Sequence, residues 1–129
     1  MSRKVLVDTS IWVEFFRGKN QKVKTHVSNL IKSQRACLTG VVMAELFHGV
    51  KTEQEVELLN ETMGALDYFE TKRSTWERTG KILRNLRLKG VTLPLSDVLL
   101  ATIAEENGCE ILTSDNHFEK LDGIILHQI

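Results

Sequence analysis

The chain has 129 residues, enough to bury about two-thirds of the surface exposed by its unfolded form, so we expect a single domain over residues 1–129. Seventeen basic and seventeen acidic side chains cancel, which argues against strong non-specific binding to nucleic acid but leaves room for a local basic patch. The longest uncharged apolar run after the N-terminal region, residues 98–104, is far too short to cross a membrane. Because Cys37 and Cys109 lack metal-ligand spacing and have apolar neighbours, we favour buried reduced thiols and a cytoplasmic location.

Short apolar runs alternate with segments of helical periodicity along the whole chain. The sequence predicts strands over residues 5–7, 36–39, 68–70, 110–113 and 124–126. It predicts helices over residues 11–16, within the basic segment 17–35, and over 40–50, 53–66, 74–88 and 96–107. This alternation indicates a three-layer α/β/α sandwich with a mostly parallel central sheet of about five strands.

Local signals place the ends and faces of several predicted helices. Thr9 or Ser10 is a plausible cap for the first helix, and Gly18 a plausible stop. Ser96 is the predicted cap of the last helix, with an acidic residue in its first turn. In the helix over 74–88, Trp76 is assigned to the inward face.

Four carboxylates occupy positions where this architecture places ligand-binding groups. Asp8 and Asp115 follow predicted strands, and the carboxyl ends of parallel strands share the ligand-binding edge of a sheet. Asp97 begins a helix that enters this edge, although stabilisation of the helix dipole, worth about 0.3–1 kcal/mol, also explains an aspartate there. Glu45 has mostly apolar neighbours within its helix, and an exposed glutamate remains an alternative.

Such a cluster would be unfavourable without compensation, because converging carboxylates repel one another and some of their pKa values rise. Divalent cations would neutralise the repulsion. Hard oxygen ligands with serine and threonine hydroxyls nearby favour Mg²⁺ or Mn²⁺ over zinc.

Four separated motifs resemble those of the PIN-domain ribonucleases, specifically the VapC-type toxins of toxin–antitoxin pairs. The resemblance covers nearly the whole chain. The motifs are Val7-Asp8-Thr9-Ser10, Ala44-Glu45-Leu46 followed by Gly49, Pro94-Leu95-Ser96-Asp97, and Leu112-Thr113-Ser114-Asp115-Asn116-His117-Phe118. The fourth motif often carries a basic residue between the threonine and the aspartate, where this chain has Ser114, a change that could alter substrate contacts.

The resemblance implies a metal-dependent endoribonuclease that hydrolyses RNA phosphodiester bonds. It implies one or two Mg²⁺ or Mn²⁺ ions held by Asp8, Glu45, Asp97 and Asp115. Thr9, Ser10 and Thr113 would be hydroxyls that orient these carboxylates or their waters. The implied partners are a cognate antitoxin, a second copy of the chain, and a structured RNA such as tRNA or rRNA.

Two other functional classes stay open from sequence. A catalytically inactive PIN-fold binding module would keep the fold without the metal chemistry, and metal titration separates it from a nuclease. A receiver- or phosphatase-like phosphoryl-transfer protein would use Asp8 as phosphoacceptor. That reading needs a second acidic residue beside Asp8, where the chain has Thr9 and Ser10, and a well-placed late lysine, for which Lys120 is a poor candidate.

The aromatic residues of the first helix suggest a docking site. Together with the basic helix that follows, Trp12, Phe15 and Phe16 are predicted to form a groove for an antitoxin segment. Core packing is an equal alternative for Phe15 and the favoured one for Trp12. The basic segment 17–35 is either a solvated face or a surface for RNA phosphates or a partner.

Overall fold

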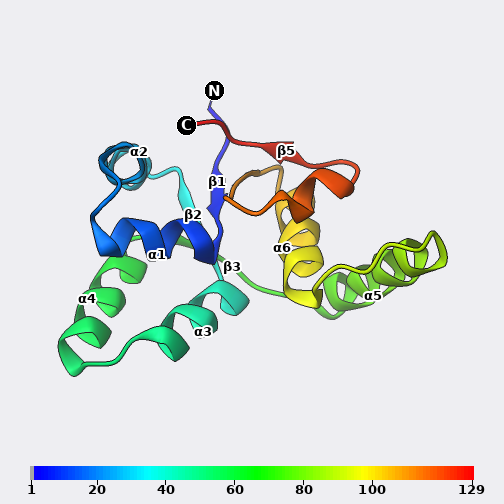
Figure 1. The fold of residues 1–129 in the computed structure, drawn as a ribbon, viewed down its shortest axis with the longest axis horizontal. Coiled ribbons are helices and arrows are strands. Elements are labelled where there is room, and N and C mark those ends of the chain that lie inside the picture. Colours follow the sequence, from blue (N-terminus) through cyan, green and yellow to red (C-terminus); the bar gives the residue numbers. More distant parts are fainter. Residues whose placement is uncertain (1) are drawn as a thin grey trace.

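The structure is a computed structural model that describes residues 2–129. Its five strands form one sheet in the order β3-β2-β1-β4-β5, and every neighbouring pair is parallel (Figure 1). The strands are β1 (Val5–Val7), β2 (Ala36–Thr39), β3 (Asp67–Phe69), β4 (Glu110–Leu112) and β5 (Ile125–Leu126). The predicted α/β class is therefore confirmed, with a sheet that is parallel throughout.

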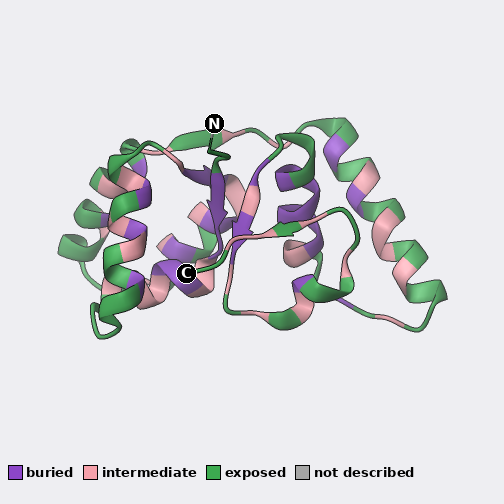
Figure 2. Ribbon diagram, turned by 90° about the horizontal axis from the view of Figure 1, so that it is seen from above, coloured by how far each residue is buried: buried purple, intermediate pink, exposed green. Residues whose placement is uncertain are grey.

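Helices cover both faces of this sheet. They are α1 (Thr9–Arg17), α2 (Gln21–Lys32), α3 (Gly40–Gly49), α4 (Glu53–Gly64), α5 (Arg73–Leu88), α6 (Leu95–Glu106) and the short 3₁₀ helix η1 (Asn116–Lys120). The first four lie on one side of the strands, while α5 and α6 lie on the other (Figures 1 and 2). Within residues 2–129, no helix has both the length and the apolar character needed to cross a membrane.

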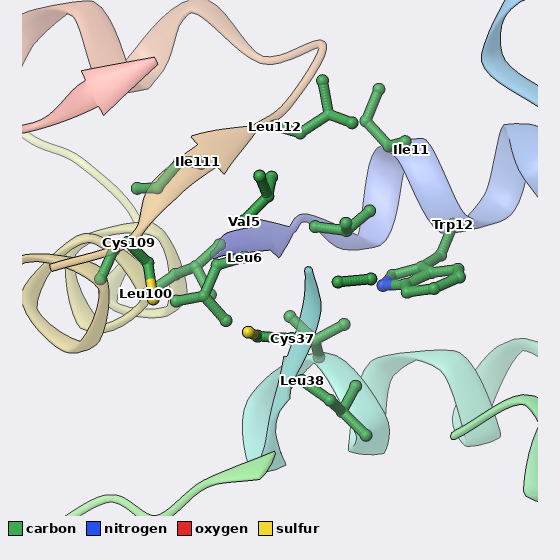
Figure 3. Packing of buried hydrophobic residues seen from close by; sticks show 14 of the residues in the cluster. Val5, Leu6, Ile11, Trp12, Cys37, Leu38, Leu100, Cys109, Ile111 and Leu112 are labelled. Atoms are coloured by element: carbon green, nitrogen blue, oxygen red, sulfur yellow. The ribbon is translucent and has the colours of Figure 1, made fainter. Parts of the chain in front are cut away.

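The central strands form the middle of the hydrophobic core. All residues of β1 and β2 are buried, because helices pack on both faces of a parallel sheet. Leu6, Ile111 and Leu100 belong to this core, as does Trp12, which lies on the other side of the strands from Leu100 (Figure 3). Trp12 is 1% exposed, so its favoured core role is confirmed. The predicted use of Trp12 as antitoxin-binding surface is wrong, because its side chain is enclosed in the core.

The chain winds away from β1 in two directions. The connections through α1–α2 and α3–α4 build the sheet toward β3, whereas the chain returns through α5–α6 to place β4 on the other side of β1. The order of the strands therefore reverses between β1 and β4. In open α/β sheets, a crevice forms outside the carboxyl ends of the strands at such a switch point.

Helix α6 lies between the sheet and α5, and its burial fixes its position. All seven residues from Val98 to Ala104 are buried. The one polar member, Thr102, satisfies its hydroxyl by donating to the Val98 carbonyl at 2.7 Å. This apolar core segment holds the first turn of α6, and with it Asp97, at the carboxyl edge of the sheet.

Two predicted helix caps are wrong. Asp8 is the N-cap of α1, yet its side chain makes no capping hydrogen bond. Helix α6 begins at Leu95 with Pro94 as its N-cap, so Ser96 lies inside the first turn. The predicted end of α1 is confirmed, because Gly18 adopts a left-handed conformation with φ of 69°.

The predicted inward position of Trp76 on α5 is wrong. Its side chain is 50% exposed, and the buried residues of this helix are Thr75 and Thr79. The two threonines can face inward because Thr79 donates to the Thr75 carbonyl at 2.8 Å and Thr75 donates to Glu106 at 2.7 Å. Because both hydroxyls are hydrogen-bonded, the face of α5 that carries these threonines can be buried. The pattern of apolar residues alone does not indicate this face.

We expect a Trp76→Ala variant to lose less than about 1 kcal/mol of unfolding free energy, because substitutions at exposed positions have small effects. Urea unfolding followed by circular dichroism measures this change. A loss of about 3 kcal/mol or more, the range of a buried aromatic side chain, would contradict the exposed position.

Candidate metal centre

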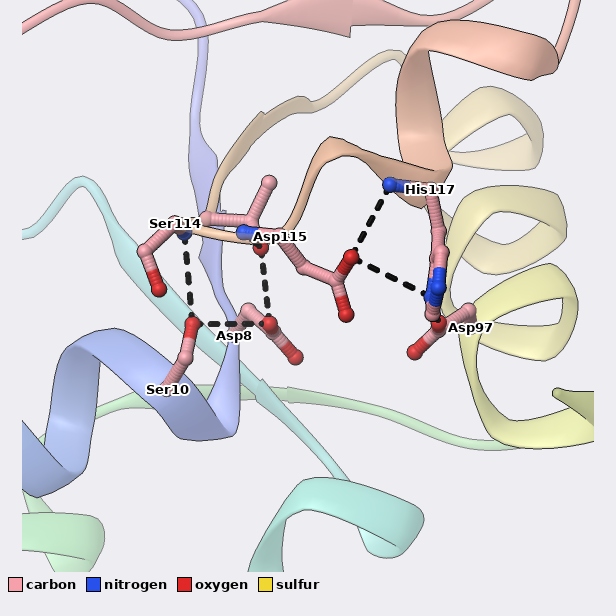
Figure 4. Close-up of polar contacts among 7 residues, drawn as sticks. Asp8, Ser10, Asp97, Ser114, Asp115 and His117 are labelled. Carbon is pink, nitrogen blue, oxygen red and sulfur yellow. Dashed lines mark hydrogen bonds and ion pairs between the residues drawn. The ribbon is translucent and has the colours of Figure 1, made fainter. Parts of the chain in front are cut away.

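Asp8 is fixed at the junction of β1 and β4. Its backbone N–H donates to the Leu112 carbonyl at 2.9 Å, and its side chain is 9% exposed. Two hydroxyls donate to the same carboxylate oxygen, Oδ2: Ser10 at 3.0 Å and Thr113 at 2.8 Å (Figure 4). Both contacts leave Oδ1 available, so the carboxylate is oriented and still has ligand capacity.

The loop after β4 is tied to the same residues. The Ser114 N–H donates to Ser10 Oγ at 3.3 Å, and the Asp115 N–H donates to Thr113 Oγ1 at 2.9 Å. These bonds join the end of β1 to the loop in front of η1. Thr113 and Ser10 therefore orient Asp8 and hold the loop that carries Asp115.

A second group of side chains lies beside Asp8. His117 Nδ1 is 2.7 Å from Asp97 Oδ2 and 3.1 Å from Asp115 Oδ1, and the His117 N–H donates to Asp115 at 2.9 Å (Figure 4). One ligand atom from each of these three residues lies within 4.8 Å of the other two. The structure thus brings Asp97 and Asp115 together, as predicted, and adds a histidine.

Glu45 is an exposed residue of α3, and a hydrogen bond from Thr9 connects it to the segment that carries Asp8. Its Oε1 accepts a hydrogen bond from Thr9 Oγ1 at 2.8 Å, and Thr9 directly follows Asp8. Glu45 is absent from the compact group formed by Asp97, Asp115 and His117. The structure therefore places Glu45 at the periphery of the cluster.

The electrostatics of the cluster disfavour negative charge on Asp97. Burial raises the pKa of its carboxyl above the ordinary value, and the charges of Asp115 and Asp8 raise it further, while His117 opposes the shift. The influence of both aspartates shows that the three carboxylates share one electrostatic environment. A cation at this position would remove the repulsion.

We expect metal-free Asp97→Asn protein to be at least as stable as the wild type at pH 7.5. In the folded protein Asp97 binds its proton more tightly than in the unfolded chain, so it contributes stability at low pH that is lost as pH rises through its raised pKa. Asparagine does not ionise, so the variant does not lose this stability as pH rises. Thermal unfolding in EDTA at pH 4.5 and 7.5 should show the difference in Tm, variant minus wild type, increasing with pH.

The comparison is repeated in a His117→Gln background, which removes the imidazole that contacts Asp97. A difference in Tm that is independent of pH, with the variant less stable at both values, would instead indicate that Asp97 only supports the start of the helix.

His117 belongs to the fourth motif, but the sequence alone does not indicate it as a site residue. Its spacing of two residues from Asp115 was a usable signal, but its approach to Asp97 depends on the 3₁₀ turn of η1, which was not predicted. Buried Phe118 fixes this turn against α6.

The donor set fits a hard divalent cation. Carboxylate oxygens come from Asp8 after β1, Asp97 in α6 and Asp115 after β4, and the hydroxyls of Ser10 and Thr113 contact Asp8. Mg²⁺ and Mn²⁺ prefer oxygen donors, and Mn²⁺ also accepts an imidazole nitrogen. Burial is the main cause of the raised pKa of Asp97, and the charges of Asp115 and Asp8 add to it.

These features define a class: a parallel α/β domain with an acidic, cation-compatible site at its topological switch point. The profile of the PIN domain family matches residues 5–124 of the sequence, and the chain belongs to this family. No curated protein matches the sequence.

Solved structures with the same fold are similar over almost their full length. A DNA-bound VapBC from Salmonella typhimurium has a TM-score of 0.83 at 21% identity and covers 98% of both chains. VapBC2 from Rickettsia felis, bound to a promoter DNA fragment, has a TM-score of 0.80 at 20% identity, covering 95% of this chain and 96% of its own. VapBC-5 from Mycobacterium tuberculosis, a member of the VapBC family of toxin–antitoxin systems, has a TM-score of 0.61 at 20% identity, covering 98% and 100%.

Proposed function

We propose that this PIN-domain protein is a VapC-type toxin, an Mg²⁺- or Mn²⁺-dependent endoribonuclease held in check by a cognate antitoxin in the cytoplasm. The observation that carries the proposal is the convergence of Asp8, Asp97 and Asp115 from three elements at the switch point of the sheet. Family membership supports the nuclease chemistry, and the similarity to VapBC structures supports the toxin class.

In this proposal Asp8, Asp97 and Asp115 hold the ion, and Glu45 contributes from the periphery. When bound, the ion supplies positive charge at the scissile phosphodiester and lowers the pKa of water, as divalent cations do in nucleases. Ser10 and Thr113 orient Asp8 through its Oδ2. His117 fixes the relative positions of Asp97 and Asp115 by contacting both carboxylates.

Basic residues of α5 are suited to hold the RNA backbone. Arg78 is paired with Glu105 and Glu106, and Lys81 is paired with Glu77. Arg84 and Arg87 are exposed and make no ion pair with any residue from 2 to 129. They occupy the half of α5 that leads through the following turn to the start of α6, where Asp97 lies. We assign them to phosphate contacts with a structured RNA such as tRNA or rRNA.

The antitoxin segment is assigned to an apolar hollow on the other side of Glu45. This hollow lies between α1, α3 and α4 and is lined mainly by Val13, Phe16, Leu46, Val50 and Leu58. Arg17, Glu45 and Glu55 also line it, so a bound segment would contact Glu45 at the periphery of the acidic site. This assignment moves the expected groove from α1–α2 to α1–α3–α4 and keeps Phe16 as a contact.

A second copy of the chain completes the proposed assembly. The exposed residues Leu88 and Leu95, at 62% and 54%, lie at the two ends of the segment that connects α5 to α6, and Leu95 precedes Asp97 by two residues. Covering Leu95 in a homodimer would place apolar contacts beside the site.

The test of this function uses purified full-length protein, freed of antitoxin, and total cellular RNA. With Mg²⁺ we expect a small set of new 5′ ends at defined positions in one or a few structured RNAs, identified by sequencing. EDTA should abolish these ends, and Arg84→Gln/Arg87→Gln should reduce them without changing Mn²⁺ binding. Cleavage that persists in EDTA would overturn the metal-dependent reaction. Unchanged RNA with Mg²⁺ or Mn²⁺ would favour the inactive binding module.

A further inference from the structure

A second cluster of metal-ligating side chains lies at the opposite edge of the sheet. His26 belongs to α2, His127 follows β5, and Glu110 is the first residue of β4. Asp8 and Thr113 lie past the carboxyl ends of β1 and β4, whereas Glu110 pairs with Val5 at their amino ends. The cluster is therefore separate from the acidic site, and an inference about it does not depend on the function proposed for that site.

The three side chains form a chain of close contacts. His26 Nε2 lies 2.7 Å from His127 Nε2, and His127 Nδ1 lies 2.6 Å from Glu110 Oε1. The ring centroids are 4.9 Å apart, and the rings are tilted by 49°. Two ring nitrogens from segments distant in sequence thus face each other across a single gap.

The hydrogen bonds of this cluster assign a role to each ring nitrogen. Glu110 accepts from His127 Nδ1–H, which makes His127 Nε2 the acceptor that faces His26 Nε2. Burial lowers the pKa of His26, and the proximity of His127 and Arg35 lowers it further. A neutral pair can share one proton between the Nε2 atoms, or both nitrogens can bind a cation in its place.

The two rings can reach the geometry of a metal site by a small movement. Two nitrogens bound tetrahedrally to Zn²⁺ at about 2.0–2.1 Å stand roughly 3.3 Å apart, so the rings need to separate by about 0.6 Å and turn until both Nε2 atoms point to the ion. Glu110 occupies the place of the carboxylate that orients many metal-binding histidines through the other ring nitrogen. His26 also lines an open hollow together with Thr25 and Asn29.

We propose that His26 and His127 form a binding site for a borderline divalent cation of the Zn²⁺ class, with Glu110 orienting His127 and waters completing the coordination. Imidazole nitrogens favour such ions, whereas the oxygen-rich acidic site favours Mg²⁺ or Mn²⁺. The bound ion would join α2 to the segment after β5. Binding to the folded state alone would raise the thermal stability of the chain.

The test measures the shift in Tm of the full chain on addition of ZnCl₂ at pH 7.5. All proteins carry His117→Gln, so that zinc binding by the acidic site is weakened. We expect Zn²⁺ to raise Tm by several degrees in this background and equally in a His48→Gln control, which alters an exposed histidine of α3. Adding His26→Gln should abolish the rise, as should His127→Gln.

A second measurement needs no variant of the cluster. In ¹⁵N-histidine-labelled protein, one equivalent of Zn²⁺ should shift the Nε2 resonances of His26 and His127 while those of His48 stay in place. This readout decides the proposal even where His127→Gln fails to fold. Unmoved His26 and His127 resonances, or an equal rise in Tm with and without His26, would show a hydrogen-bonded pair only and overturn the proposal.

Discussion

An Asp8→Asn variant is expected to lose Mg²⁺-dependent RNA cleavage by more than about 100-fold. Removing even the outer partners of metal ligands typically costs 10–100-fold in affinity or activity, and Asp8 is proposed as a direct ligand. Asparagine keeps the size of the side chain and one acceptor oxygen for Ser10 and Thr113, so the local hydrogen bonds can persist. The expected loss is therefore electrostatic in origin.

The same variant should respond differently to metal. In EDTA its Tm should equal or exceed that of the wild type, because one of several mutually repelling charges is gone. Added Mn²⁺ should stabilise the wild type and leave the variant nearly unchanged. Asp122→Asn, at an exposed position outside the cluster, is the matched control and should behave as wild type in both assays. Full cleavage by Asp8→Asn would rule out its ligand role.

A Phe118→Ala variant is expected to lose about 3–5 kcal/mol of unfolding free energy, the range for a buried aromatic side chain replaced by alanine. Phe118 is 1% exposed and is the residue of η1 that belongs to the hydrophobic core, and η1 contacts α6. Phe118→Leu, which leaves a smaller cavity, should lose clearly less. Urea unfolding of both variants measures the difference, and a loss below about 1 kcal/mol for Phe118→Ala would show that the turn is loosely packed.

Phe118 also links stability to the site. It follows His117, whose side chain contacts Asp97 and Asp115. Loosening η1 should lower Mn²⁺ affinity even where the variant remains folded, and Phe118→Leu should retain most of that affinity.

Most of the fold could be predicted from the sequence, because buried strands and helices carry apolar side chains in recognisable runs. Apolar residues at 5–7 and 36–39 predicted β1 and β2 with their observed bounds, since strands covered on both faces need apolar side chains throughout. The run from Val98 to Ala104 likewise marked the buried helix α6. Trp76 shows the limit of this reasoning: hydrogen-bonded Thr75 and Thr79 set the phase of α5, and no pattern of apolar residues contains that information.

The site was predicted less completely, because distances between separate elements are set by tertiary packing. The positions after β1 and β4 indicated Asp8 and Asp115, and the structure connects them through Thr113. The position of Glu45, exposed and joined only through Thr9, depends on how α3 packs beside α1. His117 enters the cluster through a 3₁₀ turn that leaves no periodic signal in so few residues.

Calorimetric titration of the metal-free protein with Mn²⁺ tests the acidic site most directly. In a background with His26→Gln, which removes the proposed second site, we predict saturable binding of one or two Mn²⁺ ions per chain. Asp97→Asn should weaken this binding by at least about 10-fold, while Asp122→Asn should leave it unchanged. Absence of Mn²⁺ binding at millimolar concentration, or equal binding by Asp97→Asn and its parent, would contradict a cation site built by these carboxylates.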